Sequence, residues 1–185
     1  GTEALLCFVD LVSDHLLGDR IALPVNTTDH ARRIAEAHGV AVTDTKMSTA
    51  ALMAAATEIG IGFAADGRGG FILPGFLPAF DAAASLVKIL DLLARTGREL
   101  SAVREGLPKV HLANETVVTP WDQKGLVMRS LVEMAGRAVT LVDGVKVLHA
   151  DGWALALPDP EEPVTRVWAE ASSDAEARRL AQEYG

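Results

Sequence analysis

The chain has 185 residues, of which 49% are hydrophobic and 23% are charged. This length is enough for one large domain or two small ones, and the composition excludes a disordered or fibrous protein. The 25 acidic and 17 basic side chains give a formal charge of -8, which would repel a nucleic-acid backbone and anionic lipids.

The sequence carries no signal for a membrane or an oxidising compartment. No apolar run approaches the roughly 20 residues that span a bilayer, and no basic and apolar leader opens the chain. Cys7 is the one cysteine and lies in an apolar run, so we expect a small buried side chain. We predict a cytoplasmic protein that binds neither membranes nor nucleic acid. Because the chain starts without methionine, we also expect a piece of a longer protein whose other domains are its partners.

The first half of the chain alternates strands and helices. Leu5, Phe8, Val9 and Val12 recur at helical spacing and predict an opening helix over 3–17. The next expected elements are a strand at 20–25, a helix ending near 38, a strand at 40–42, a helix at 48–58, an apolar run at 59–65, a strand at 71–73, a helix closed by Gly97 and a short helix from 99. This order is typical of a three-layer α/β domain with a parallel sheet.

The pattern changes after Pro108, where we place a domain boundary, giving domains 1–108 and 109–185. The expected elements of the second part are a strand at 110–119, a helix at 122–136, strands at 138–142, 145–149, 153–157 and 165–171, and a last helix capped by Ser172 or Ser173. Asp143-Gly144 and Asp151-Gly152 suit hairpin turns. We therefore predict a small α+β domain with an antiparallel sheet of about four strands and two helices.

Several familiar functional motifs are excluded by their sequence context or spacing. Gly60 to Ala65 fits a dinucleotide fingerprint, but a helix leads in and a turn leads out, which is the wrong order for a pyrophosphate site. No two of the five histidines have the four-residue spacing of a helical metal site, and no nucleophile elbow is present. We therefore expect no metal site, no catalytic residue and no cofactor within this chain.

Two loops could carry ligand chemistry. In Asp66-Gly67-Arg68-Gly69-Gly70, a carboxylate able to accept from sugar hydroxyls and a guanidinium able to bind phosphate stand among glycines; the alternative is a plain hairpin turn. Asp159, Glu161 and Glu162 cluster in a second loop and could attract a divalent cation. The alternative there is a set of solvated charges.

The most specific pattern lies in the second domain: Asp143-Gly144-Val145-Lys146, then Asp151-Gly152-Trp153, then Glu162-Pro163 and the run from Arg166 to Ala171. In residues and spacing this pattern resembles the final domain of the α-D-phosphohexomutases, which include phosphomannomutase and phosphoglucomutase. The resemblance spans nearly the whole chain and makes the two parts similar to the third and fourth domains of that family.

The resemblance implies roles for several residues. The family's sugar-selecting loop corresponds to residues 66–70, so Asp66, Gly67, Arg68 and Gly69 become substrate-binding candidates, with Lys46 of the Thr45-Lys46 pair in a second substrate segment. The family's phosphate loop corresponds to residues 157–163, which makes Asp159, Glu161, Glu162 and the following Arg166 the phosphate-loop positions. The phosphoserine and the Mg²⁺ site of the family belong to its first two domains.

The retained loops depart from the family's pattern. The glutamate, serine and histidine of the sugar loop correspond to Asp66, Arg68 and Gly70, and an arginine and two hydroxyls of the phosphate loop correspond to Leu157, Asp159 and Glu161. Two carboxylates would repel a phosphate dianion.

These departures predict a degenerate sugar-phosphate-binding or structural module without catalysis of its own. Similar mutase-like tails follow mannose-1-phosphate guanylyltransferase regions in some bacterial proteins, which by analogy suggests GDP-mannose metabolism. The alternatives are that the whole protein is an active phosphomannomutase or phosphoglucomutase, an isomerase with a remodelled phosphate loop, or that the chain is a homo-oligomerisation or docking domain.

Overall fold

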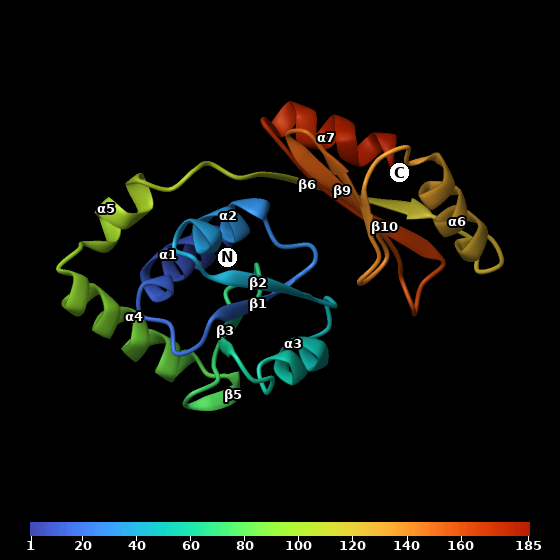
Figure 1. Ribbon diagram of the computed structural model, residues 1–185. Helices are drawn as coiled ribbons and strands as arrows, with labels where there is room; N and C mark the ends of the chain where they lie inside the picture. The colour runs from blue at the N-terminus through green and yellow to red at the C-terminus, as the bar shows by residue number, and fades with distance from the viewer. The chain divides into compact units, whose positions relative to one another are not determined.

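The computed structural model describes residues 1–185, and the chain divides into two compact units, Gly1–Lys109 (unit 1) and Val110–Gly185 (unit 2) (Figure 1). Each unit has its own five-stranded sheet. No helix of either unit combines the length and the apolar character that a membrane crossing requires.

Unit 1 is built on a mixed sheet in the order β2-β1-β3-β4-β5, in which β1, β2 and β3 are parallel and β4 and β5 are antiparallel. Its elements are α1 (Thr2–Ser13), β1 (Arg20–Pro24), α2 (Asp29–Ala37), β2 (Ala41–Thr45), α3 (Thr49–Ala55), β3 (Ile61–Ala65), β4 (Phe71–Leu73), β5 (Leu77–Phe80), α4 (Ala82–Thr96) and α5 (Leu100–Glu105). The predicted α/β class is confirmed, but the sheet is mixed rather than parallel, because β4 and β5 follow β3 through short antiparallel connections. Strand β5 was not predicted, because it is short and contains Pro78, which is rare inside strands.

Local sequence sets the helix boundaries of unit 1. The hydroxyl of Thr28 accepts from the His30 amide at the start of α2, and that of Ser48 accepts from the Ala51 amide at the start of α3. The Asp81 carboxylate caps α4 in the same way by accepting from the Ala84 amide. These side chains satisfy amides that lack a partner in the first helical turn, which explains why the helices begin where they do.

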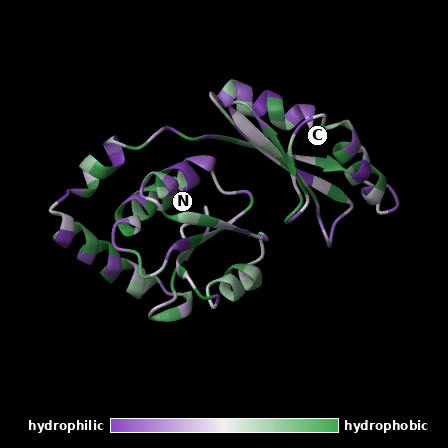
Figure 2. Cartoon of the chain, in the orientation of Figure 1, coloured by the Kyte–Doolittle hydropathy of each residue, from purple (hydrophilic) through white to green (hydrophobic).

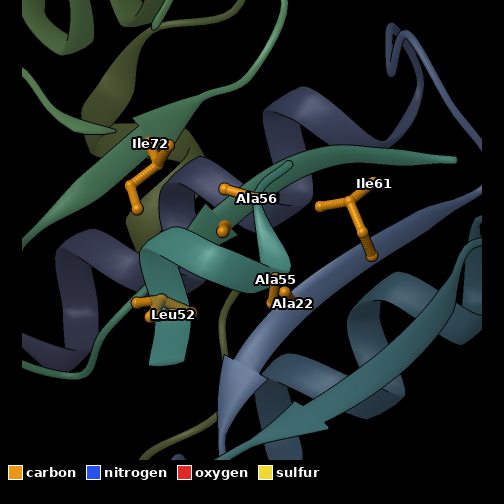
Figure 3. Close-up of a cluster of buried hydrophobic side chains, with 7 residues drawn as sticks. Ala22, Leu52, Ala55, Ala56, Ile61 and Ile72 are labelled. Carbon is orange, nitrogen blue, oxygen red and sulfur yellow. The ribbon is translucent and has the colours of Figure 1, made fainter. Parts of the chain in front are cut away.

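Two apolar clusters hold the sheet of unit 1. One is formed by buried residues of α3 and the sheet strands, shown in Figure 3: Ala22, Leu52, Ala55, Ala56, Ile61, Ala64 and Ile72. Helix α3 is coloured pale to green along its length in Figure 2, which fits its contact with this cluster. In the other cluster the rings of Phe8, Phe63 and Phe71 pack together, bringing α1 against β3 and β4.

Helix α4 turns an unexpected face to the sheet. Its leucines follow a helical spacing, yet Leu86 is 60% and Leu90 is 56% exposed, whereas Ser85 and Leu92 are buried. Burial of Ser85 is tolerated because its hydroxyl donates to the Asp81 carbonyl. Figure 2 shows hydrophobic and hydrophilic bands alternating along this helix.

Unit 2 contains an antiparallel sheet in the order β6-β10-β9-β8-β7 and two helices. Its elements are β6 (His111–Val118), α6 (Lys124–Met134), β7 (Val139–Thr140), β8 (Val145–His149), β9 (Gly152–Pro158), β10 (Val164–Ala171) and α7 (Asp174–Glu183). Val167 and Ala169 are the inward residues of β10, and they pack with Leu180 and Ala181 of α7. The Ser173 hydroxyl accepts from the Glu176 amide, so Ser173 is the cap of α7. The predicted α+β organisation is therefore confirmed, with five strands.

Candidate functional site

The candidate residues of unit 1 lie at one edge of its sheet. Strands β1, β2 and β3 run parallel, so their carboxyl ends meet at the same edge. Lys46 follows β2 there, and loop 66–70 follows β3. After β1 the chain forms β2 on one side of β1 and then, through α3, β3 on the other side. Ligands of open α/β sheets bind outside the carboxyl ends of strands at such a switch point. The topology thus brings Lys46 and loop 66–70 to a common edge.

Loop 66–70 is organised by the carboxylate of Asp66. Its Oδ1 accepts from the backbone amides of Arg68 at 2.9 Å, Gly69 at 3.0 Å and Gly70 at 2.8 Å. The Asp66 amide donates to the Gly70 carbonyl at 3.0 Å and closes the turn. Asp66 therefore shapes the loop through one oxygen, which the sequence did not predict. The Arg68 side chain is exposed and makes no ion pair within the chain.

The stems of this loop rest on an aromatic cluster. Phe63 lies three residues before Asp66 on β3, and Phe71 directly follows Gly70 on β4. The Phe63 and Phe71 rings are 6.1 Å apart, and Phe8 of α1 packs against them at 5.0 Å and 4.7 Å, respectively. This packing fixes both stems, so Arg68 projects from a supported loop.

Gly70 is matched to Phe80 of β5. A Cβ at position 70 would lie 2.5 Å and 2.7 Å from two carbons of the Phe80 ring, which leaves no room for a side chain unless Phe80 moves. The histidine that the phosphohexomutase loop would place here is therefore incompatible with the present position of Phe80. The sequence showed the change at Gly70 but gave no signal for its partner, because β5 itself was missed.

The surroundings of loop 66–70 favour an anion. The N-terminus of α1 lies beside it, since a Cβ on Gly69 would stand 3.4 Å from the Gly1 nitrogen. The N-terminal end of a helix carries a partial positive charge. Together with the exposed cations of Arg68 and Lys46, this end gives the sheet edge three positive contributions.

The second candidate loop joins β9 to β10 in unit 2 and is closed by Asp159. Asp159 Oδ1 accepts from the amides of Glu161 at 2.9 Å and Glu162 at 3.0 Å. Asp159 Oδ2 accepts from Arg166 Nε at 2.8 Å, and Arg166 also donates to Glu162 Oε2 at 2.9 Å. The Glu161 side chain is exposed. The structure thus brings together Asp159, Glu162 and Arg166 and leaves Glu161 outside.

Lys124 of α6 is a further member of this loop that the sequence did not reveal. Its ammonium donates to the carbonyls of Asp159 and Glu162 and lies 3.6 Å from the centre of the Trp121 ring. It comes from 35 residues away in sequence, and no motif marks it. Two cations, Arg166 and Lys124, therefore converge on loop 157–163.

Acid is expected to weaken this loop. Hydrogen bonding from Arg166, supported by the Glu161 amide, lowers the pKa of Asp159 below its ordinary value of 3.8. A carboxylate with a lowered folded-state pKa contributes stability above its unfolded-state pKa, and this contribution is lost as the pH falls through the folded-state value. We expect Asp159→Asn to lose less of its unfolding free energy than the wild type between pH 7 and pH 3, measured by urea denaturation. An equal loss in both proteins would contradict the assignment.

A third polar group is buried in the sheet of unit 2. Trp153 Nε1 donates to Glu170 Oε2 at 2.8 Å, and Lys146 Nζ lies 4.3 Å from the centre of the Trp153 ring. All three side chains are buried and come from β9, β10 and β8, respectively. All three residues belong to the sequence pattern that carries the family resemblance. Part of that pattern therefore corresponds to a buried polar cluster.

No group of three or more His, Cys, Asp or Glu residues is placed so that it could hold a metal ion. Asp159 and Glu162 instead accept from Arg166. The Mg²⁺ site that the resemblance implies belongs to the family's first two domains, whereas this chain resembles the third and fourth.

Comparison with known families decides the identity of the fold. The model of phosphoglucomutase/phosphomannomutase, alpha/beta/alpha domain III, matches residues 3–111, which is more than half of the chain. The chain belongs to the phosphoglucomutase/phosphomannomutase family. The resemblance to the α-D-phosphohexomutases is confirmed.

Curated relatives of this family member are longer than the chain. A phosphoglucomutase/phosphomannomutase of Thermococcus kodakarensis is 29% identical over 174 residues, covering 91% of this chain and 38% of the relative. A phosphoglucosamine/phosphogalactosamine mutase of Sulfurisphaera tokodaii is 30% identical over 121 residues, covering 63% of this chain and 26% of the relative. The chain therefore spans well under half of the length of these relatives.

Solved structures support the same fold. A phosphoglucomutase/phosphomannomutase family protein of Burkholderia thailandensis matches with a TM-score of 0.79 and 23% identity, covering 98% of this chain and 40% of that one. An N-acetylphosphoglucosamine mutase of Aspergillus fumigatus, solved with GlcNAc-6P and magnesium, matches with a TM-score of 0.67 and 14% identity, covering 99% and 44%. The substrate-binding and phosphate-loop residues of this phosphohexomutase-like chain stay predictions.

Proposed function

We propose that the chain is the hexose-phosphate-binding C-terminal region of a phosphohexomutase-like protein and has no catalysis of its own. The observation that carries the proposal is loop 66–70, which holds the unpaired guanidinium of Arg68 on a supported turn. A guanidinium without an internal carboxylate can bind two oxygens of a phosphate. The relatives named above act on hexose and hexosamine phosphates, which fits this ligand class.

The proposed contacts use the carboxyl edge of the sheet in unit 1. Arg68 binds the phosphate, and Lys46, two strand positions away from β3 in the sheet, adds a second cation. Neighbouring strands are about 4.8 Å apart, so this offset is about 10 Å, which is within the combined reach of a long lysine side chain and a hexose phosphate. Asp66 acts through the loop amides and positions Arg68.

Titration of the 185-residue chain with mannose 1-phosphate, glucose 1-phosphate and glucosamine 1-phosphate tests this function. We expect saturable NMR shifts of the Gly67 and Gly69 amides. Arg68→Met should weaken binding by about 10- to 100-fold, the effect of one charge-assisted hydrogen bond. The matched control is Arg95→Met on α4, where the lost arginine is bonded to Asp91 on the same helix.

The outcomes distinguish a module that binds sugar phosphates from one with a structural role alone. Unchanged amide signals at millimolar concentrations of all three sugar phosphates would leave only a structural role. Equal affinity of the wild type and Arg68→Met would remove Arg68 from the site. Binding by the Arg95→Met control should match that of the wild type.

A second candidate is mutase activity of the whole protein, favoured by the mutase names of the curated relatives. Phosphoryl transfer requires a positioned donor and a neutralising cation, and the resemblance places both in the family's first two domains, outside the two domains that this chain resembles. Assay of the full-length protein for interconversion of glucose 1-phosphate and glucose 6-phosphate tests this second candidate. Turnover that requires Arg68 would favour the mutase. The relatives described above are named for mutase activity, so the link to GDP-mannose and a guanylyltransferase stays a prediction.

A further inference from the structure

Loop 157–163 has the donor set of an anion site. Two consecutive backbone amides, those of Glu161 and Glu162, point at one oxygen, and the guanidinium of Arg166 points at a second oxygen 2.8 Å away from its Nε. Consecutive amides of this kind form a concavity that binds anions, and an arginine provides the matching charge. In this loop both oxygens belong to the carboxylate of Asp159.

The two cations around loop 157–163 already have partners within the chain. Arg166 bonds to Asp159 and Glu162, and the Lys124 ammonium is held by two loop carbonyls and the Trp121 ring. The Asp159 side chain is only 15% exposed, so its carboxylate sits inside the loop rather than in solvent. An external anion would have to displace this carboxylate to reach the same amides.

We propose that Asp159 is an internal anion that occupies loop 157–163 and excludes phosphate from it. A tethered carboxylate competes at a high effective concentration, on the order of millimolar or above for a short link. An external phosphate must also overcome repulsion by the neighbouring Glu161 and Glu162. Loop 157–163 is therefore a closed anion site, in contrast to loop 66–70, where Asp66 contacts only amides and Arg68 has no internal carboxylate.

The Asp159 proposal does not depend on the proposed function, because it concerns a loop of unit 2 and inorganic phosphate alone. Hexose-phosphate binding is read from the amides of Gly67 and Gly69, whereas occupation of loop 157–163 is read from the amides of Glu161 and Glu162. Either result can fail without the other.

The test is an NMR titration of the 185-residue chain with inorganic phosphate at constant ionic strength. In the wild type we expect the amides of Glu161 and Glu162 to stay unchanged. Asp159→Ser removes the internal anion and should give saturable shifts of both amides, with an affinity at least about tenfold higher than that of the wild type. Adding Arg166→Met to this variant should abolish the gain.

Asp151→Ser is the matched control, because Asp151 is exposed and precedes β9, whereas Asp159 follows it. The control removes the same charge at a distance of about 25 Å along the strand and should behave as the wild type. If Asp159→Ser does not fold, Asp159→Asn keeps an oxygen for the two amides and should still show a smaller gain. The proposal is overturned if phosphate shifts the two amides equally in the wild type, or if neither variant gains affinity.

Discussion

Phe63→Ala is expected to lower the unfolding free energy of unit 1 by about 3 to 5 kcal/mol, the usual cost of removing a buried phenylalanine. Phe63 is 0% exposed and contacts the rings of Phe8 and Phe71 from the middle of β3. Its loss would leave a cavity between α1 and the sheet that the neighbouring aromatic rings cannot fill without moving. The change also removes the support under the first stem of loop 66–70.

Urea denaturation, monitored by amide hydrogen exchange in unit 1, measures this loss of unfolding free energy. Phe76→Ala is the control, because Phe76 is 71% exposed and its removal should change the unfolding free energy by less than about 0.5 kcal/mol. We also expect Phe63→Ala to increase hydrogen exchange of the Arg68 and Gly69 amides at 25 °C. Equal unfolding free energies for the Phe63 and Phe76 variants would show that the aromatic cluster does not hold this part of the fold.

Most of the fold could be predicted from local signals. Thr28, Ser48 and Ser173 cap helices because their hydroxyls accept from amides two or three residues ahead, a relation that is visible in sequence. The exposed face of α4 could not be predicted in this way. The spacing of its leucines defines an apolar stripe, but packing against α1 and β4 determines which side of the helix is covered.

The candidate loops show a different limit of sequence analysis. Sequence context identifies the loops that contain Asp66 and Asp159, and it predicts that Asp66 binds a sugar and that Asp159 repels phosphate. The structure shows that each carboxylate accepts from amides of its own loop. The sequence shows that a carboxylate is present, but its effect on a ligand depends on the orientation of the side chain in the folded loop. Lys124 was missed because the fold alone brings it to the loop.

The sheet of unit 2 depends on a close approach at Gly152, the glycine of the Asp151-Gly152-Trp153 pattern. A Cβ at this position would lie 1.9 Å from the carbonyl oxygen and 2.8 Å from the carbonyl carbon of Glu170. Both are backbone atoms of β10, so Gly152→Ala would force β9 and β10 apart. Overpacking that moves backbone costs up to about 3 kcal/mol and sometimes more, and we expect a loss of at least about 3 kcal/mol in unfolding free energy.

Tryptophan fluorescence during urea denaturation measures this effect selectively, because all three tryptophans lie in unit 2. The matched control is Gly125→Ala in α6, where an added Cβ meets nothing within 4 Å; alanine should raise stability there by up to about 1 kcal/mol through its helix propensity. Changes in unfolding free energy of opposite sign for Gly152→Ala and Gly125→Ala would show that the loss arises from the contact between β9 and β10. An unchanged denaturation midpoint in Gly152→Ala would mean that β9 can shift without cost. We do not expect such a shift, because Trp153, the residue after Gly152, is paired with Glu170 of β10 and donates a hydrogen bond to its carboxylate.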